Sequence, residues 1–214
     1  MEEVAAFGLL CFVSLFAVVE PLGLIPIFIG MTGSRAPAAQ RNVARRACIV
    51  AFMTLFIFAL TGQLIFRFFG ISVDSMKVVG GIIFFLIGYE MLQARHSKTA
   101  VDDGHGHVTD PDSDVALTPL GIPMIAGPGA ITSVIVRWNE ADTMAKQVAV
   151  LVAIVAVMIV TLVLLLSARR VARFLGESGN RVLLRLMGLI TMVIAVELFF
   201  GGLTPIVQKM WKPA

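Results

Sequence analysis

The sequence Val19-Glu20-Pro21-Leu22-Gly23 places a carboxylate, a proline and a glycine inside an apolar run from Val4 to Met31. The proline removes a backbone donor and its ring clashes with the preceding helical turn. It also disfavours the α region for the residue before it. Within a bilayer, free backbone groups and a charge are tolerated only against other protein or a water-filled cavity. The stretch therefore predicts a membrane helix that is broken at Glu20-Pro21.

The composition indicates a polytopic, all-α membrane protein. Of the 214 residues, 58% are hydrophobic and 14% are charged, whereas soluble domains contain about 25% charged residues. Several apolar runs exceed the roughly 18 residues that mark a membrane-spanning helix. The formal charge of +3 comes from lysines and arginines in the connections, with no basic stripe interleaved with aromatic residues. We expect the lipid bilayer as a partner and no nucleic acid.

We expect six transmembrane helices. They lie at roughly Val4–Met31, Val43–Phe66, Met76–Gln93, Val115–Val136, Val148–Ser167 and Val182–Leu203. Most lysines and arginines fall in the connections after the first, third and fifth of these segments. The positive-inside rule places those connections in the cytoplasm, so both termini are predicted outside, on the periplasmic side.

The chain also repeats itself. A shift of 107 residues aligns Pro21 with Pro128, Thr54 with Thr161, Gly81 with Gly188 and Glu90 with Glu197. Each half then holds three segments, and this odd number makes the halves enter the membrane from opposite sides. The sequence therefore predicts one membrane domain of two inverted repeats, residues 1–94 and 115–214, joined by a cytoplasmic loop at 95–114. Secondary transporters use this arrangement to build a site near the midplane.

Both aligned prolines suit the first position of a helix, where the missing N–H costs nothing. We interpret Glu20-Pro21 and Gly127-Pro128 alike, as a cap residue followed by a helix that begins on proline. The fourth segment then splits into Pro119–Ala126 and Pro128–Val136. The first segment is either tilted or re-entrant around its break, and the sequence does not choose between the two.

In either case, a half-helix N-terminus presents free N–H groups and a partial positive charge near the midplane, which suits a carboxylate or another anion. The candidate substrate- and ion-binding residues are therefore Glu20, Pro21, Gly23, Gly127, Pro128 and Gly129. Glu20 has two interpretations. It either caps the local half-helix or binds a proton or cation as access alternates.

Two further carboxylates are secondary candidates. Glu90 and Glu197 lie near the ends of their segments, where they can reach the interface or pair with a nearby cation such as Arg95. Gly80-Gly81 and Gly88 are more typical of close helix packing in membranes than of substrate contact.

Nothing in the sequence indicates an enzyme. There is no glycine-rich phosphate loop and no histidine within a predicted segment. The three histidines, His96, His105 and His107, lie with several aspartates in the predicted loop. Because ligands without rigid spacing rarely form a metal site, we expect a solvated hinge there, with no metal and no cofactor.

Four stretches resemble the MarC/SnatA family of prokaryotic membrane proteins. They are Glu20-Pro21-Leu22-Gly23-Leu24-Ile25-Pro26-Ile27-Phe28, Val79-Gly80-Gly81-Ile82-Ile83-Phe84-Phe85-Leu86-Ile87-Gly88, Pro119-Leu120-Gly121-Ile122-Pro123-Met124-Ile125-Ala126-Gly127-Pro128-Gly129-Ala130-Ile131 and Arg185-Leu186-Met187-Gly188-Leu189-Ile190. The resemblance covers nearly the whole chain in the expected order. In one place the chain departs from the family pattern, which usually has Asp or Asn before the first proline, where this chain has Glu20.

The resemblance implies six spans, residence in the prokaryotic inner membrane, and transport of small neutral amino acids such as glycine and alanine with a coupling cation, either a proton or sodium. One alternative is an exporter of amino acids or other metabolites. Another, from a different class, is a membrane scaffold protein that transports nothing.

Overall fold

The structure is a computed structural model in which residues 2–33, 35–93 and 116–211 are described. In chain order the helices are α1 (Glu2–Val19), α2 (Pro21–Thr32), α3 (Pro37–Phe69), α4 (Val73–Leu92), the π-helix η2 (Ala116–Ile125), α6 (Pro128–Glu140) and α7 (Met144–Trp211). The predicted loop at 95–114, with its three histidines, lies outside the described residues.

Helix α7 consists of two arms that meet at a kink. Gly176 has non-helical angles there, with φ 65° and ψ −177°. We call Met144–Val171 the first arm and Arg181–Trp211 the second arm. With Glu2–Thr32, α3 and α4, the arms make five stretches of the described chain that are long and apolar enough to cross a membrane. The segments predicted at these five places are therefore confirmed as long apolar helices.

The predicted segment Val115–Val136 is built differently. Its two parts are η2, with 10 residues, and α6, with 13, and neither is long enough to span a membrane alone. The π-helical winding is visible at Ala126, whose N–H donates to the Gly121 carbonyl, five residues earlier, at 3.0 Å. The expected α-helix from Pro119 to Ala126 is therefore wrong in type and in starting point, because the prolines in this stretch lack the N–H groups of a regular ladder. Helix α6 begins on Pro128, as predicted.

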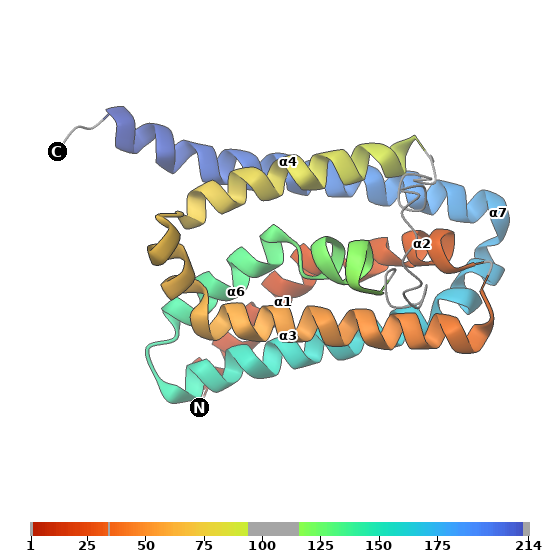
Figure 1. Cartoon of the computed structure of the whole chain (residues 1–214), viewed down its shortest axis with the longest axis horizontal. Coiled ribbons are helices and arrows are strands. Elements are labelled where there is room, and N and C mark those ends of the chain that lie inside the picture. The colour runs from red at the N-terminus through yellow and green to blue at the C-terminus, as the bar shows by residue number, and fades with distance from the viewer. Residues whose placement is uncertain (1, 34, 94–115, 212–214) are drawn as a thin grey trace, which may run out of the picture.

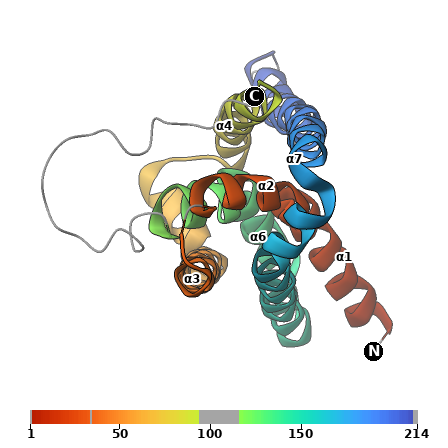
Figure 2. The same cartoon turned by 90° about the vertical axis from the view of Figure 1, so that its right-hand side faces the viewer.

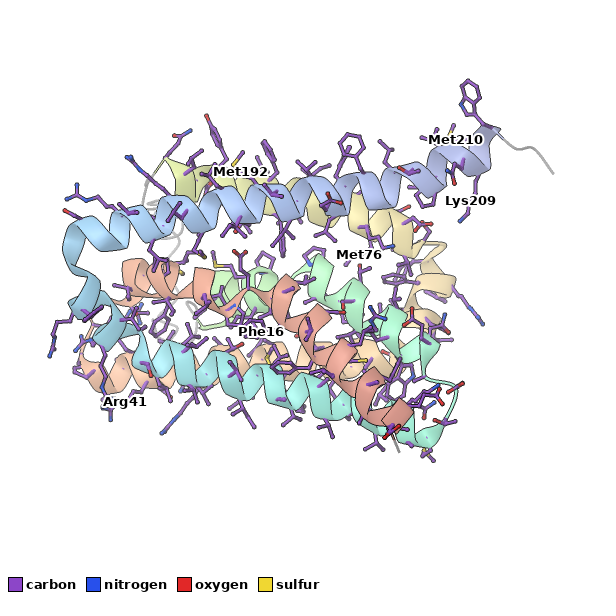
Figure 3. The ribbon with its side chains drawn as sticks, turned by 180° about the vertical axis from the view of Figure 1, so that it is seen from behind. Phe16, Arg41, Met76, Met192, Lys209 and Met210 are labelled. Atoms are coloured by element: carbon purple, nitrogen blue, oxygen red, sulfur yellow. The ribbon has the colours of Figure 1, made fainter. Side chains whose placement is uncertain are left out.

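The broken helices occupy the middle of the molecule. Figures 1 and 2 show α4 and the second arm of α7 side by side on one side, and α3 with the first arm of α7 toward the other. Helix α1 begins and α7 ends at the same end of the molecule (Figure 1). Seen from behind, α2 continues in the general direction of α1 and does not turn back (Figure 3). The first segment is therefore bent rather than re-entrant.

Glycines bring α4 and the second arm of α7 into backbone contact. A methyl carbon added to Gly81 would lie 2.7 Å from the Ala195 carbonyl oxygen, and one added to Gly88 would lie 2.8 Å from the Gly188 carbonyl oxygen. Small residues allow this approach in membrane proteins, where close packing replaces the hydrophobic driving force. The prediction that these glycines serve helix packing is confirmed.

Candidate functional site

The break between α1 and α2 is a single residue in a left-handed conformation. Glu20 has φ 48° and ψ 57°, which costs an L-residue roughly 1–2 kcal/mol. Its N–H still donates to the Phe16 carbonyl at 2.9 Å, and its own carbonyl accepts from Gly23 N–H at 2.9 Å. One residue therefore ends α1 and starts α2, and Pro21 follows at the first helical position. Strained backbone of this kind clusters at functional sites.

The Glu20 side chain does not cap α2. No side-chain hydrogen bond is made to the start of that helix, so the capping interpretation is wrong. Instead Glu20 Oε2 accepts from Thr191 Oγ1 at 2.8 Å, across to the second arm of α7. The same hydroxyl lies 2.8 Å from the Met187 carbonyl oxygen, and a threonine has one proton to donate. The hydroxyl can therefore satisfy only one of these two acceptors at a time.

The second carboxylate oxygen, Glu20 Oε1, is buried without a hydrogen-bond partner among the described residues. Glu20 is also one of the residues that line a cavity of about 30 Å³, together with Gly23, Phe84, Met124 and Thr191. These walls come from α2, α4, η2 and α7. A cavity of this size has room for a water molecule or a small cation beside the carboxylate. A buried carboxylate oxygen without a partner, on a residue that lines such a cavity, is suited to binding a proton or a cation.

The second break, between η2 and α6, has another geometry. Gly127 is extended, with φ −75° and ψ 171°, and its carbonyl accepts from Ile131 N–H at 2.9 Å as α6 begins. The two helix starts therefore share a proline at the first position, but the residue before it is left-handed in one case and extended in the other. The interpretation of each break as one residue that precedes a helix beginning on proline is therefore confirmed, whereas the backbone conformation of that residue differs between the two breaks.

One aromatic side chain connects the two breaks. Phe84 of α4 lines the cavity beside Glu20, and a methyl carbon added to Gly127 would lie 3.0 Å from Phe84 Cε1. A methyl carbon added to Gly129 would lie 2.8 Å from Val18 Cγ1, on the last turn of α1. All six primary candidates gather in this region, where Pro21, Gly23, Gly127, Pro128 and Gly129 are buried and Glu20 is half-buried.

The secondary candidates lie elsewhere. Glu90 and Glu197 are exposed on α4 and on the second arm of α7, and neither makes a hydrogen bond or ion pair within the described ranges. Arg95, the suggested partner of Glu90, is outside those ranges. The structure does not bring these two carboxylates to the cavity.

Sequence reasoning missed Thr191 and Phe84 as members of the site. A signal for them was present, because the shift of 107 residues that pairs position 20 with 127 also pairs position 84 with 191. No group of three or more His, Cys, Asp or Glu side chains suited to a metal ion occurs in the part of the chain that the structure describes.

These features define an integral membrane protein with several long apolar helices, two broken helices in its middle and a half-buried carboxylate between them. The chain belongs to the MarC family, because the model of the MarC family integral membrane proteins matches residues 6–207. The resemblance seen in the four sequence stretches is therefore confirmed.

Relatives occur in archaea and bacteria. A UPF0056 membrane protein of Pyrococcus abyssi is 36% identical over 203 residues, which cover 95% of this chain and 96% of the relative. YvbG of Bacillus subtilis is 37% identical over 194 residues, 90% of this chain and 92% of the relative. A UPF0056 membrane protein of Escherichia coli is 31% identical over 192 residues, 90% and 89% of the two chains. No solved structure matches the chain.

Proposed function

We propose that this protein is a secondary transporter of small neutral amino acids of the glycine and alanine type, driven by a proton or sodium gradient across the prokaryotic inner membrane. The observation that carries the proposal is the buried, unpartnered oxygen of Glu20, a residue that lines a cavity between two broken helices. In this proposal the protein performs no chemistry on its solute. An intramembrane carboxylate facing a cavity is expected to serve a transport or proton pathway.

The proposal includes six spans in two inverted repeats, with both termini outside. Pairs of contacts in which the two halves of the chain swap equivalent positions support it. Under the shift of 107 residues, the contact of Glu20 with Thr191 corresponds to that of Gly127 with Phe84. The contact of Gly81 with Ala195 corresponds in the same way to that of Gly188 with Gly88. Exchanged contacts of this kind are expected where two copies of a unit meet across a twofold axis.

The directions of the broken helices support the repeat as well. Figure 1 adds that α1–α2 and η2–α6, the first elements of the two halves, run in opposite directions. Two copies of one unit that enter the membrane from opposite sides are expected to run in opposite directions in this way.

The two helix starts serve different ends of the solute in this proposal. The start of α2 already has a carboxylate beside it, because a methyl carbon on Gly23 would lie 3.4 Å from Glu20 Oε1. The start of α6 has only Gly127 before its proline and carries no acidic side chain in its first turn. We assign the solute carboxylate to the free N–H groups of α6 and the solute ammonium or the coupling cation to Glu20.

Reconstitution in liposomes tests the function directly. Purified protein is assayed for uptake of glycine, alanine and larger neutral amino acids under imposed proton or sodium gradients. Gradient-driven accumulation of the small amino acids is the expected result. Accumulation that occurs only when the ion gradient is imposed in the orientation opposite to that in the cell would favour the exporter alternative. If no solute accumulates under any gradient, the scaffold alternative remains.

The Gly23→Ala variant should lower the initial uptake rate about tenfold. Its new methyl carbon would lie 3.3 Å from Glu20 Cδ, closer than ordinary contact, so the carboxyl group must shift by a few tenths of an ångström relative to Thr191. Helix stability should not fall, since alanine gains up to about 1 kcal/mol over glycine within a helix. The matched control is Gly8→Ala on α1, whose methyl carbon would make an ordinary 3.5 Å contact with Ala149 Cβ. Equal uptake rates in the two variants would contradict the assignment of Glu20.

A further inference from the structure

Phe84 is the aromatic side chain that lies near both helix breaks. It is 6% exposed, lines the cavity beside Glu20, and would lie 3.0 Å from a methyl carbon on Gly127 and 3.8 Å from one on Gly129. Its ring therefore borders both the carboxylate and the start of α6. Any solute held between those two groups must lie against this ring.

The cavity is too small for an amino acid as it stands. Its volume of about 30 Å³ corresponds to space for about one water molecule. Two of the other walls, Met91 and Met124, are flexible side chains that can repack around a ligand. A phenylalanine ring is rigid by comparison and has only two side-chain torsions. Among the residues that line the cavity, Phe84 has the bulkiest rigid side chain, so shortening it should enlarge the cavity most.

We propose that Phe84 is a specificity-determining residue that restricts transport to solutes with small side chains. The inference rests on the proposed function, in which the solute ammonium lies at Glu20 and its carboxylate at the start of α6. The α-carbon of such a solute is placed beside the Phe84 ring, so the ring competes with the solute side chain for the same space.

The test compares initial uptake rates of glycine, alanine, valine and leucine by liposomes containing the original protein, Phe84→Ala or Phe84→Leu. The ratio of leucine to alanine uptake should rise at least about tenfold in Phe84→Ala, because one methylene in an apolar pocket changes discrimination roughly 10- to 200-fold. Phe84→Leu should give an intermediate ratio. The matched control is Phe85→Ala, since Phe85 is 41% exposed and lines a separate apolar groove between α4 and α7.

The possible outcomes separate the inference from the function on which it rests. An unchanged leucine-to-alanine ratio in folded Phe84→Ala overturns the role of Phe84, and so does an equal rise in Phe85→Ala. If the original protein takes up none of the four amino acids, the proposed function fails instead. If Phe84→Ala does not fold, the leucine-to-alanine uptake ratio of Phe84→Leu, a smaller change, is compared with that of the original protein in the same way.

Discussion

Replacing Glu20 by glutamine should lower gradient-driven uptake at least about thirtyfold while leaving the protein folded. The amide keeps the shape of the side chain and an oxygen that accepts from Thr191 Oγ1, but it loses the charge that binds an ammonium group or a coupling cation. Removing one partner of a buried charged contact costs about 2–5 kcal/mol, which corresponds to roughly thirty- to several-thousand-fold in affinity. The measurement is the initial uptake rate in liposomes, normalised to the amount of inserted, monodisperse protein.

Two controls make this result specific. Glu197→Gln removes a carboxylate that is exposed and has no partner within the described ranges, so its uptake rate should match that of the original protein. Glu20→Asp keeps the charge but shortens the side chain by one methylene, so it should keep part of the activity. Full, gradient-dependent uptake by Glu20→Gln would exclude the carboxylate from the transport mechanism, and equal losses in Glu20→Gln and Glu197→Gln would point to a nonspecific effect of charge.

The breaks could be predicted from the sequence because their causes are local. Proline removes a donor and sets its own φ angle wherever it occurs, so a proline in an apolar run marks a candidate break. Pro21 and Pro128 do begin helices, whereas Pro26 and Pro205 lie inside α2 and α7. Long apolar runs likewise identify membrane-spanning helices without reference to the fold. The packing role of Gly81 and Gly88 follows from the same kind of argument, since a small side chain in a membrane helix is most often a packing contact.

The partners of the break residues could not be predicted in this way. Thr191 lies 171 residues from Glu20 in the chain, and its role depends on how the second arm of α7 lies against α2. The left-handed conformation of Glu20 is also a product of packing, because a residue before proline is normally extended. The π-helix before Gly127 depends on where the missing donors of two prolines fall within one short segment. These features required the structure.

In the exchanged contacts, a side chain from one half of the chain lies against the helix break of the other half. Each half supplies one helix break and one side chain that covers the break of the other half, Thr191 for Glu20 and Phe84 for Gly127. The two covers differ chemically, since one is a hydroxyl and the other an aromatic ring. In the proposed inverted repeat, the exchanged contacts therefore pair unlike chemical groups, and this difference suits a solute with two unlike charged ends.

The contact between Gly88 and Gly188 should be a sensitive packing position outside the site. A methyl carbon added to Gly188 would lie 2.7 Å from the Gly88 carbonyl oxygen and 2.8 Å from Leu92 N. Both are backbone atoms, so no side-chain rotation can relieve the overlap, and α4 must separate from the second arm of α7. Overpacking costs about 1–3 kcal/mol and occasionally more. Gly188→Ala should therefore lower the free energy of unfolding by about 2 kcal/mol, measured by denaturant titration in detergent micelles.

A glycine-to-alanine substitution elsewhere on the second arm of α7 should not lower the free energy of unfolding. Gly201 has no atom within 4 Å of an added methyl carbon, so Gly201→Ala should leave stability unchanged or raise it by up to about 1 kcal/mol through helix propensity. Gly88→Ala combined with Gly188→Ala should cost less than the sum of the two single changes, because the first alanine already separates the backbones and contacting residues are coupled. Additive costs, or a Gly188→Ala variant as stable as Gly201→Ala, would mean that α4 and α7 do not pack through these glycines.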